Sequence, residues 1–264
     1  MSKSMKNNLY DINAYDGLVS TETQSTVWEY LRNQTWYIAW RPVTVKERLA
    51  KFIPAKSNNW LNHQMPQPGA KLHRCVFADN ELDLKLNHRV IWKLWKEINA
   101  GLDEKYEITG PPEGMYEGMP LPVLPNGVIE QRGWRVYANG TASKYSSITW
   151  GPHRDNPNVD DETSVTIIYC ANPEWYPRWG GEFVFFPEDP EGKTGDHQQH
   201  NGPGQQQRGF NVGWADQGKI VSPVPNRVIV YDSRSLHNTK APCNSDAQEL
   251  QQWRVVFRAR LKTT

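Results

Sequence analysis

The second half of the chain contains short runs of β-branched and aromatic residues, with turn residues between them. The clearest runs are residues 164–170, 179–186, 218–223, 226–232 and 253–260. Runs of this length and composition indicate β-strands, and the glycine, proline and asparagine residues between them indicate turns. Several short antiparallel strands in succession predict a sandwich or a jelly roll.

A histidine and an aspartate, His153 and Asp155, lie two positions apart in Gly-Pro-His-Arg-Asp-Asn. Residues two apart on a strand point to the same face, so both side chains can reach one metal ion. His237, in Ser-Leu-His-Asn-Thr, would complete a set of two imidazoles and one carboxylate. Such a set leaves coordination positions open, as in non-haem Fe(II) oxygenases. The ordinary alternative is a surface histidine at position 153 and a turn-forming aspartate at position 155.

An arginine on the last predicted strand is the candidate anchor for an anionic cosubstrate. The planar guanidinium of Arg254 can bind both oxygens of a carboxylate. Arg258 and Arg260 share a strand face with Arg254 if the strand is regular, so either could share or replace its role. Arg254 is the first choice because it lies nearest the His237 end of the strand.

Together these motifs resemble the Fe(II)- and 2-oxoglutarate-dependent dioxygenases, closest to their prolyl 4-hydroxylase-like branch. The resemblance covers residues 131–262 and implies a mainly β fold with flanking helices and a double-stranded β-helix (jelly-roll) core. The expected organisation is a single domain over residues 1–264, with mostly helical support in residues 1–130 and the catalytic core in residues 131–264. The matching segments are Tyr137-x-x-Gly140, His153-Arg154-Asp155-Asn156, residues 166–175, Gly180-Gly181-Glu182-Phe183 and residues 226–237.

The resemblance implies a metal centre and a reaction. Fe(II) would be bound by His153, Asp155 and His237, and 2-oxoglutarate would chelate the iron through its keto-acid end. With O₂, the enzyme would hydroxylate an unactivated C–H bond and release succinate and CO₂, and ascorbate could serve as a reductant. A peptidyl prolyl group is the first substrate candidate. A nucleic-acid base and a free amino acid or other small molecule are the alternatives. Loss of a metal ligand would mark a third class, a non-catalytic β-barrel, and all three ligands are present.

The resemblance also implies that the distal carboxylate of 2-oxoglutarate meets Arg254, helped by the hydroxyl of Tyr137. Residues 142–147 lengthen the segment between Tyr137 and the His-x-Asp motif, which makes Tyr145 a rival for this role. Related enzymes often have paired tyrosines where this chain has Tyr169-Cys170. Nucleic-acid demethylases of the same fold use two arginines in a comparable strand, so a second arginine here stays a candidate.

The net charge and the cysteine content limit the classes of partner that we expect. A net charge of +1 and a pI of about 7.7 give no electrostatic footprint for nucleic acid or membranes. We therefore expect a peptide, protein or small-molecule substrate, with nucleic acid not favoured. Three scattered cysteines are too few for a disulfide framework. No signal peptide and no segment of transmembrane length are present, so we expect a cytoplasmic location.

The remaining predictions concern supporting elements. Residues 20–32 and 82–98 have helical spacing, and residues 36–40 indicate a strand. Residues 110–125 are too rich in proline to be helical. Residues 189–213 are polar and rich in glycine and glutamine, which predicts a flexible flap next to the site.

Aromatic residues flank the motifs. Tyr145, Trp150, Trp175 and Trp179 could hold a proline-rich peptide against their flat apolar faces. They could equally pack the rim of the barrel. The sequence leaves both interpretations open.

Overall fold

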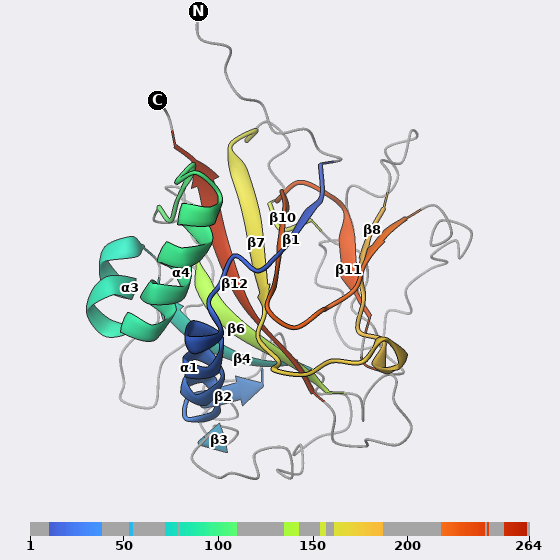
Figure 1. The fold of residues 1–264 in the computed structure, drawn as a ribbon. Coiled ribbons are helices and arrows are strands. Elements are labelled where there is room, and N and C mark those ends of the chain that lie inside the picture. Colours follow the sequence, from blue (N-terminus) through green and yellow to red (C-terminus); the bar gives the residue numbers. More distant parts are fainter. Residues whose placement is uncertain are drawn as a thin grey trace, which may run out of the picture.

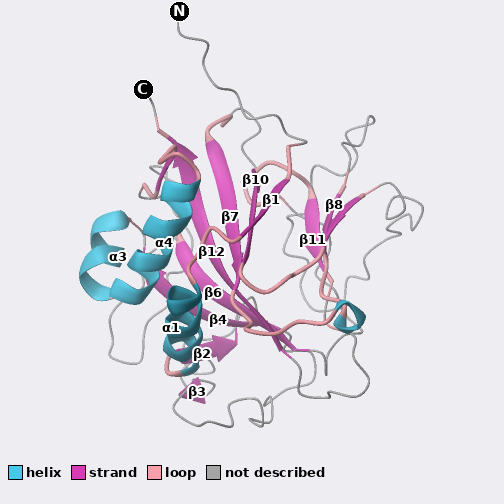
Figure 2. Cartoon of the chain, in the orientation of Figure 1, coloured by secondary structure: helices cyan, strands magenta, loops and turns pink. Residues whose placement is uncertain are grey.

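The computed structural model describes residues 11–38, 53–54, 72–78, 80–109, 135–142, 154–156, 161–186, 218–240, 242 and 251–262. Two antiparallel sheets form the framework of this part of the chain, and helices pack on one side of the larger sheet (Figure 1, Figure 2). The predicted fold class, mainly β with flanking helices around a jelly-roll core, is confirmed.

The large sheet is antiparallel throughout and joins strands from both halves of the chain. β5 (Tyr106–Glu107) pairs with β12 outside the main path. The strand order is β1 (Asn13–Asp16), β10 (Arg227–Asp232), β7 (Ser164–Cys170), β12 (Gln251–Leu261), β6 (Val136–Ala142), β4 (Leu72–Ala78), β2 (Thr35–Ile38) and β3 (Ile53–Pro54).

The small sheet lies across from the large sheet, on the side away from the helices of residues 21–32 and 81–101 (Figure 1). Its order is β11 (His237–Thr239), β8 (Phe183–Phe185) and β9 (Lys219–Val221). Phe183 and Phe185 share an apolar cluster with Ile168 and Tyr231 of the large sheet. This cluster fills the space between the sheets, so side chains that point into that space form the interior of the jelly roll.

Strand β12 separates two cores because successive side chains point to opposite faces. Trp253 and Phe257 point outward into the helix-covered core, where Trp253 packs on Trp28 with ring centroids 4.6 Å apart. Val256 belongs to the cluster between the sheets. The alternation therefore points Arg254 and Arg258 into the interior, on the same face as Val256.

Helices α1 (Thr21–Arg32) and α4 (Arg89–Gly101) cover the outer face of the large sheet (Figure 2). Ser20 caps α1, as the sequence indicates, because its side chain accepts a hydrogen bond from the Thr23 backbone N–H. The Glu97 carboxylate of α4 accepts hydrogen bonds from the Ser20 backbone N–H at 2.8 Å and from the Thr23 hydroxyl at 2.5 Å. One carboxylate thereby holds the two helices together.

The single helix predicted over residues 82–98 is two helices. α3 (Glu81–Asn87) begins after the Asn80 cap, and α4 begins after His88. His88 has φ −134° and ψ 58°, which interrupts the helical backbone, and its Nδ1 contacts the Tyr30 hydroxyl at 2.8 Å. Apolar spacing continues through the break, which is why the sequence gives no sign of it.

Other predicted supporting elements have mixed outcomes. The strand predicted over residues 36–40 corresponds to β2. Residues before 131 contribute strands of the large sheet as well as helices, and the division at residue 131 stays a prediction. Residues 110–125 and 189–213 lie outside the described residues. No helix in the described ranges is long and apolar enough to cross a membrane.

Candidate active site

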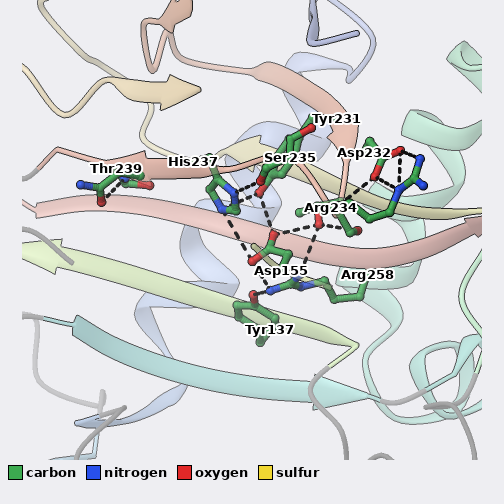
Figure 3. A network of polar contacts seen from close by, with 12 residues as sticks. Tyr137, Asp155, Tyr231, Asp232, Arg234, Ser235, His237, Thr239 and Arg258 are labelled. Carbon is green, nitrogen blue, oxygen red and sulfur yellow. Dashed lines mark hydrogen bonds and ion pairs between the residues drawn. The ribbon is translucent and has the colours of Figure 1, made fainter. Parts of the chain in front are cut away.

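Asp155 and His237 lie next to each other in a buried polar network (Figure 3). His237 begins β11, and its Nε2 lies 3.6 Å from Asp155 Oδ1. The side chains are only 5% and 6% exposed, respectively. The Asn156 backbone N–H donates to the Ser233 carbonyl at 2.8 Å, which fixes the segment carrying Asp155 against the turn after β10. His153, the third predicted ligand, lies outside the described residues.

The backbone sets the tautomer of His237. Its Nδ1 lies 3.0 Å from the Ser235 carbonyl oxygen, which can only accept a hydrogen bond. Nδ1 therefore carries a proton, which leaves Nε2 as the ring nitrogen that faces Asp155 and could bind a metal. This arrangement, with the remote nitrogen fixed by a backbone carbonyl, is typical of a metal-binding histidine.

Two hydroxyls hold the other oxygen of the Asp155 carboxylate. Tyr231 donates to Oδ2 at 2.8 Å, and Thr166 donates to the same atom at 2.9 Å. The Tyr231 hydroxyl is also 3.2 Å from His237 Nε2. Burial, with a smaller contribution from the Asp155 charge, raises the pKa of Tyr231 well above its ordinary value, so the phenol stays a neutral donor. Oδ2 is thus occupied, and Oδ1 is the oxygen turned toward His237.

Tyr231 and Thr166 did not figure among the predicted site residues. The signal that could have indicated them is strand periodicity. Tyr231 lies two positions after the inward-facing Ile229, and Thr166 lies two before the inward-facing Ile168. A polar side chain at such a position, next to a proposed metal motif, has to find a partner in the interior.

Arg258 contacts the same carboxylate from β12 (Figure 3). Its Nη2 donates to Asp155 Oδ1 at 2.5 Å and to the Tyr137 hydroxyl at 3.2 Å. Its Nη1 donates to the Thr166 hydroxyl at 3.3 Å. Burial alone would lower the pKa of Arg258, but the Asp155 charge and Tyr137 raise it above the ordinary value. The guanidinium is therefore a permanent positive charge beside Asp155.

Arg254 is almost buried, and part of its guanidinium has no partner among the described residues. It is 9% exposed, and its guanidinium carbon lies 5.5 Å from the centre of the Phe183 ring. Among the described residues, Nη1 of Arg254 is a buried donor with no hydrogen-bond partner. Burial lowers the pKa of Arg254, although an arginine keeps its proton in proteins. Opposite it on β7, burial raises the pKa of the Cys170 thiol to about 12, so Cys170 supplies no negative charge.

The strand register reverses the expected order of the arginines. Arg258 pairs with Thr166 at the level of Asp155, whereas Arg254 pairs with Cys170. The two arginine Cα atoms are four residues apart, about 13 Å along the strand. The expectation that Arg254 lies nearest the His237 end is wrong, because β12 runs antiparallel to β7 and brings Arg258 to that level. Arg254 is instead separated from the Asp155–His237 pair.

The other predicted cosubstrate-binding residues are Tyr137, Tyr145 and Arg260, and the structure describes two of them. Tyr137 pairs with Val256, between the two arginines, and points into the interior. Arg260 forms an ion pair with Asp161 at 2.9 Å. Tyr145 lies outside the described residues. Tyr137 is therefore in position to touch a ligand that extends from Arg254 toward Asp155.

The aromatic residues near the motifs lie at the Arg254 end of β12. Trp175 and Trp179 contact each other edge to face, with ring centroids 5.4 Å apart. The Gln252 side-chain amide donates to the Gly181 carbonyl at 2.8 Å, and a Cβ on Gly181 would approach Trp175 to 3.1 Å. This packing favours a rim role for both tryptophans. Trp150 lies outside the described residues.

Comparisons with known proteins identify similar solved structures only. No family model matches the chain, and no curated protein matches it in sequence. A prolyl hydroxylase from Trichoplax adhaerens, in complex with a hypoxia inducible factor peptide fragment, is 13% identical, with 94% of this chain and 83% of that chain covered and a TM-score of 0.47. HygX from Streptomyces hygroscopicus, with nickel and 2-oxoglutarate bound, is 11% identical, with 95% and 83% covered and a TM-score of 0.49.

A third similar structure is the viral collagen prolyl hydroxylase from Paramecium Bursaria Chlorella virus-1 in its 2-oxoglutarate complex. It is 11% identical, with 96% of each chain covered and a TM-score of 0.44. The similar structures are prolyl hydroxylases and other 2-oxoglutarate oxygenases, the superfamily that the sequence motifs resemble. At these identities the likeness concerns the fold.

Proposed function

We propose that this protein is an Fe(II)- and 2-oxoglutarate-dependent oxygenase that hydroxylates an unactivated C–H bond. The observation that carries the proposal is Nη1 of Arg254, which has no partner among the described residues and lies on the interior face that also carries the contacts of Asp155 and His237. A buried guanidinium without a partner is costly, and a carboxylate would supply the missing acceptor. Iron requires ligands such as the carboxylate of Asp155 and the imidazole of His237, and 2-oxoglutarate requires a cationic residue such as Arg254. All three side chains belong to the same interior.

The metal would be held by His237 Nε2, Asp155 Oδ1 and, from the sequence, His153. These donors make up the set of two histidines and one carboxylate that suits non-haem iron. Bound iron, with 2-oxoglutarate and O₂, supplies an oxidation that no side chain can perform, and succinate and CO₂ are the co-products. Reductants such as ascorbate could restore iron that has become oxidised without turnover.

The contribution of the chain is orientation. Tyr231 and Thr166 hold Asp155 Oδ2, so the carboxylate keeps Oδ1 directed toward His237. The Ser235 carbonyl keeps His237 in the tautomer that can bind a metal. Buried side chains such as Ile168 and Phe185 line the space between the sheets, which limits access of water to the reaction.

Arg254 would bind the distal carboxylate of 2-oxoglutarate through two parallel hydrogen bonds. Tyr137 points into the same interior and would touch the ligand along its length, with Tyr145 as the alternative hydroxyl. Phe183 lies against the Arg254 guanidinium and would provide an apolar wall for the aliphatic part of the cosubstrate.

A peptidyl prolyl group is our first substrate candidate, because the sequence motifs are closest to prolyl 4-hydroxylases. One observation favours an alternative, the same chemistry on a nucleic-acid base. Arg254 and Arg258 both point into the interior from one strand, the arrangement that nucleic-acid demethylases of this fold use. The net charge of +1 weighs against a long phosphate backbone as partner, since such binding depends on lysine and arginine contacts. A free amino acid or other small molecule is the further alternative.

Succinate release tests the reaction class, and mass change tests the substrate. The iron-loaded protein is incubated with 2-oxoglutarate alone and then with proline-rich peptides, free amino acids and single-stranded oligonucleotides. We expect slow succinate formation without substrate, acceleration by the true substrate, and a gain of one oxygen in its mass. Asp155→Ala should abolish succinate formation while circular dichroism stays unchanged. Full iron content and normal turnover in Asp155→Ala would overturn the assignment.

A further inference from the structure

The described side chains of the polar network between the sheets carry more positive than negative charge. Among the described residues that form the polar network there, Arg254 and Arg258 are cationic and Asp155 is anionic. The ion pair between Arg258 and Asp155 at 2.5 Å balances one of the two guanidinium charges. Arg254 remains, with its Nη1 unpartnered. The interior is therefore suited to an anion before any metal arrives.

A metal and Arg258 compete for one oxygen atom. Asp155 Oδ1 is the atom that faces His237, and it is also the acceptor of the Arg258 Nη2 hydrogen bond. A divalent cation on Oδ1 would displace that hydrogen bond and add positive charge beside a guanidinium. In a buried site such repulsion is screened far less than in water. Metal binding by itself is thus opposed by the permanent charge of Arg258.

We propose that the interior binds a small aliphatic dicarboxylate without metal, and that dicarboxylate and metal binding are positively coupled through Arg258. This inference rests on the proposed function and concerns how the binding of its two cofactors is coupled. A dicarboxylate fits because two guanidiniums point into the interior from one strand. An aliphatic chain fits because Phe183, Ile168 and Val256 are apolar residues of the same interior.

The coupling follows from the partner exchange at Arg258. One ligand carboxylate binds Arg254, and the second becomes the partner of Arg258. Asp155 Oδ1 is then released to the metal, and the ligand charge offsets the charge that the metal adds. By linkage, the metal must tighten dicarboxylate binding by the same factor.

Calorimetry on the metal-stripped full chain tests both parts. 2-Oxoglutarate and succinate are each titrated into the protein with chelator present, and Mn²⁺ is titrated with and without saturating succinate. We expect saturable dicarboxylate binding without metal, and a Mn²⁺ dissociation constant that falls by about 5- to 150-fold with succinate. Failure of both dicarboxylates to bind the metal-free protein would overturn the inference, as would a Mn²⁺ constant indifferent to succinate.

The Arg258→Met variant separates a charge effect from a structural one. Without Arg258, Asp155 Oδ1 has no competing donor from this residue, so Mn²⁺ should bind more tightly in the absence of succinate and the coupling should vanish. A merely structural role predicts the opposite, weaker Mn²⁺ binding. Arg258→Lys keeps the charge and should keep coupling of the same sign.

A second variant keeps the test decisive if Arg258→Met does not fold. Arg254→Met leaves Asp155 and its partners intact and should abolish metal-free dicarboxylate binding. Arg227→Gln is the matched control, because Arg227 lies on β10 in an ion pair with Asp16 and should leave every constant unchanged. Tight dicarboxylate binding by Arg254→Met would overturn the inference.

Turnover distinguishes this inference from the proposed function. Succinate production by the iron-loaded protein, without dicarboxylate binding to the metal-free form, would refute this inference and leave the oxygenase proposal standing. Metal-free binding without any turnover would refute the oxygenase proposal and leave the anion site standing.

Discussion

At the scale of single residues, the candidate site depends on what holds Asp155. Tyr231→Phe removes one hydroxyl from Oδ2 and leaves the ring in place. We expect metal affinity, measured by Mn²⁺ titration, to fall by about 10- to 100-fold, as is usual when a group that orients a metal ligand is lost. Tyr169→Phe is the control, because Tyr169 is buried on β7 and donates to Asn226 at 3.0 Å, in the other core. Equal loss in both variants would indicate general destabilisation.

The anchoring arginine gives a second residue-scale prediction. Arg254→Gln should raise the 2-oxoglutarate dissociation constant of the metal-loaded protein, because a charge-assisted pair contributes ~1.5–3 kcal/mol, or about tenfold to a hundredfold. Arg260→Gln should have no effect, since Arg260 pairs with Asp161. An unchanged constant in Arg254→Gln, with an increase in Arg260→Gln, would show that the choice of arginine is wrong.

At the scale of elements, the contact between α1 and α4 should respond to pH. Burial raises the pKa of Glu97, but hydrogen bonds from Thr23 and Ser20 bring the net value below the ordinary 4.5. A carboxyl with a lowered pKa stabilises the fold above its ordinary pKa and loses this contribution as pH falls through the folded value. The free energy of unfolding should therefore drop below about pH 4.5, and less steeply in Glu97→Gln. Urea unfolding at a series of pH values around 4.5 measures this free energy in both proteins. An equal fall of the free energy of unfolding with pH in the wild type and in Glu97→Gln would contradict the prediction.

The elements also show which features the sequence could predict. Strand runs such as residues 164–170 predicted β7 because β-branched and aromatic residues are concentrated in a short segment between turn residues. The break at His88 could not be predicted, because apolar helical spacing continues through it, and the contact of His88 with Tyr30 joins residues 58 positions apart. The level of Arg258 beside Asp155 likewise depends on the register between β12 and β7. The motifs therefore indicated which residue types meet, and long-range pairing decided which individual residues do so.

At the scale of the whole molecule, the large sheet unites the two parts of the chain. β1 pairs with β10, and β4 pairs with β6, so strands from before residue 131 flank the strands from after it on both sides of one sheet. We expect a single cooperative transition in calorimetry, with equal calorimetric and van't Hoff enthalpies. A fragment of residues 131–264 would expose the outer face of β12, including Trp253 and Phe257, and should aggregate. A soluble fragment with native-like exchange protection would contradict this expectation.

Strand β12 presents its aromatic residues to the helices and its arginines to the interior, and this sets what the protein can tolerate. A single inserted residue near position 252 would exchange the two faces. The guanidiniums would then enter the apolar layer beneath α4, while the aromatic rings would fill the space meant for ligands. The residues of β12 that stabilise the fold and those that would bind ligands therefore depend on the same strand register. A substitution in β12 leaves this register unchanged, whereas an insertion or deletion displaces the aromatic residues and the arginines at once. We therefore expect β12 to tolerate substitutions but not insertions or deletions.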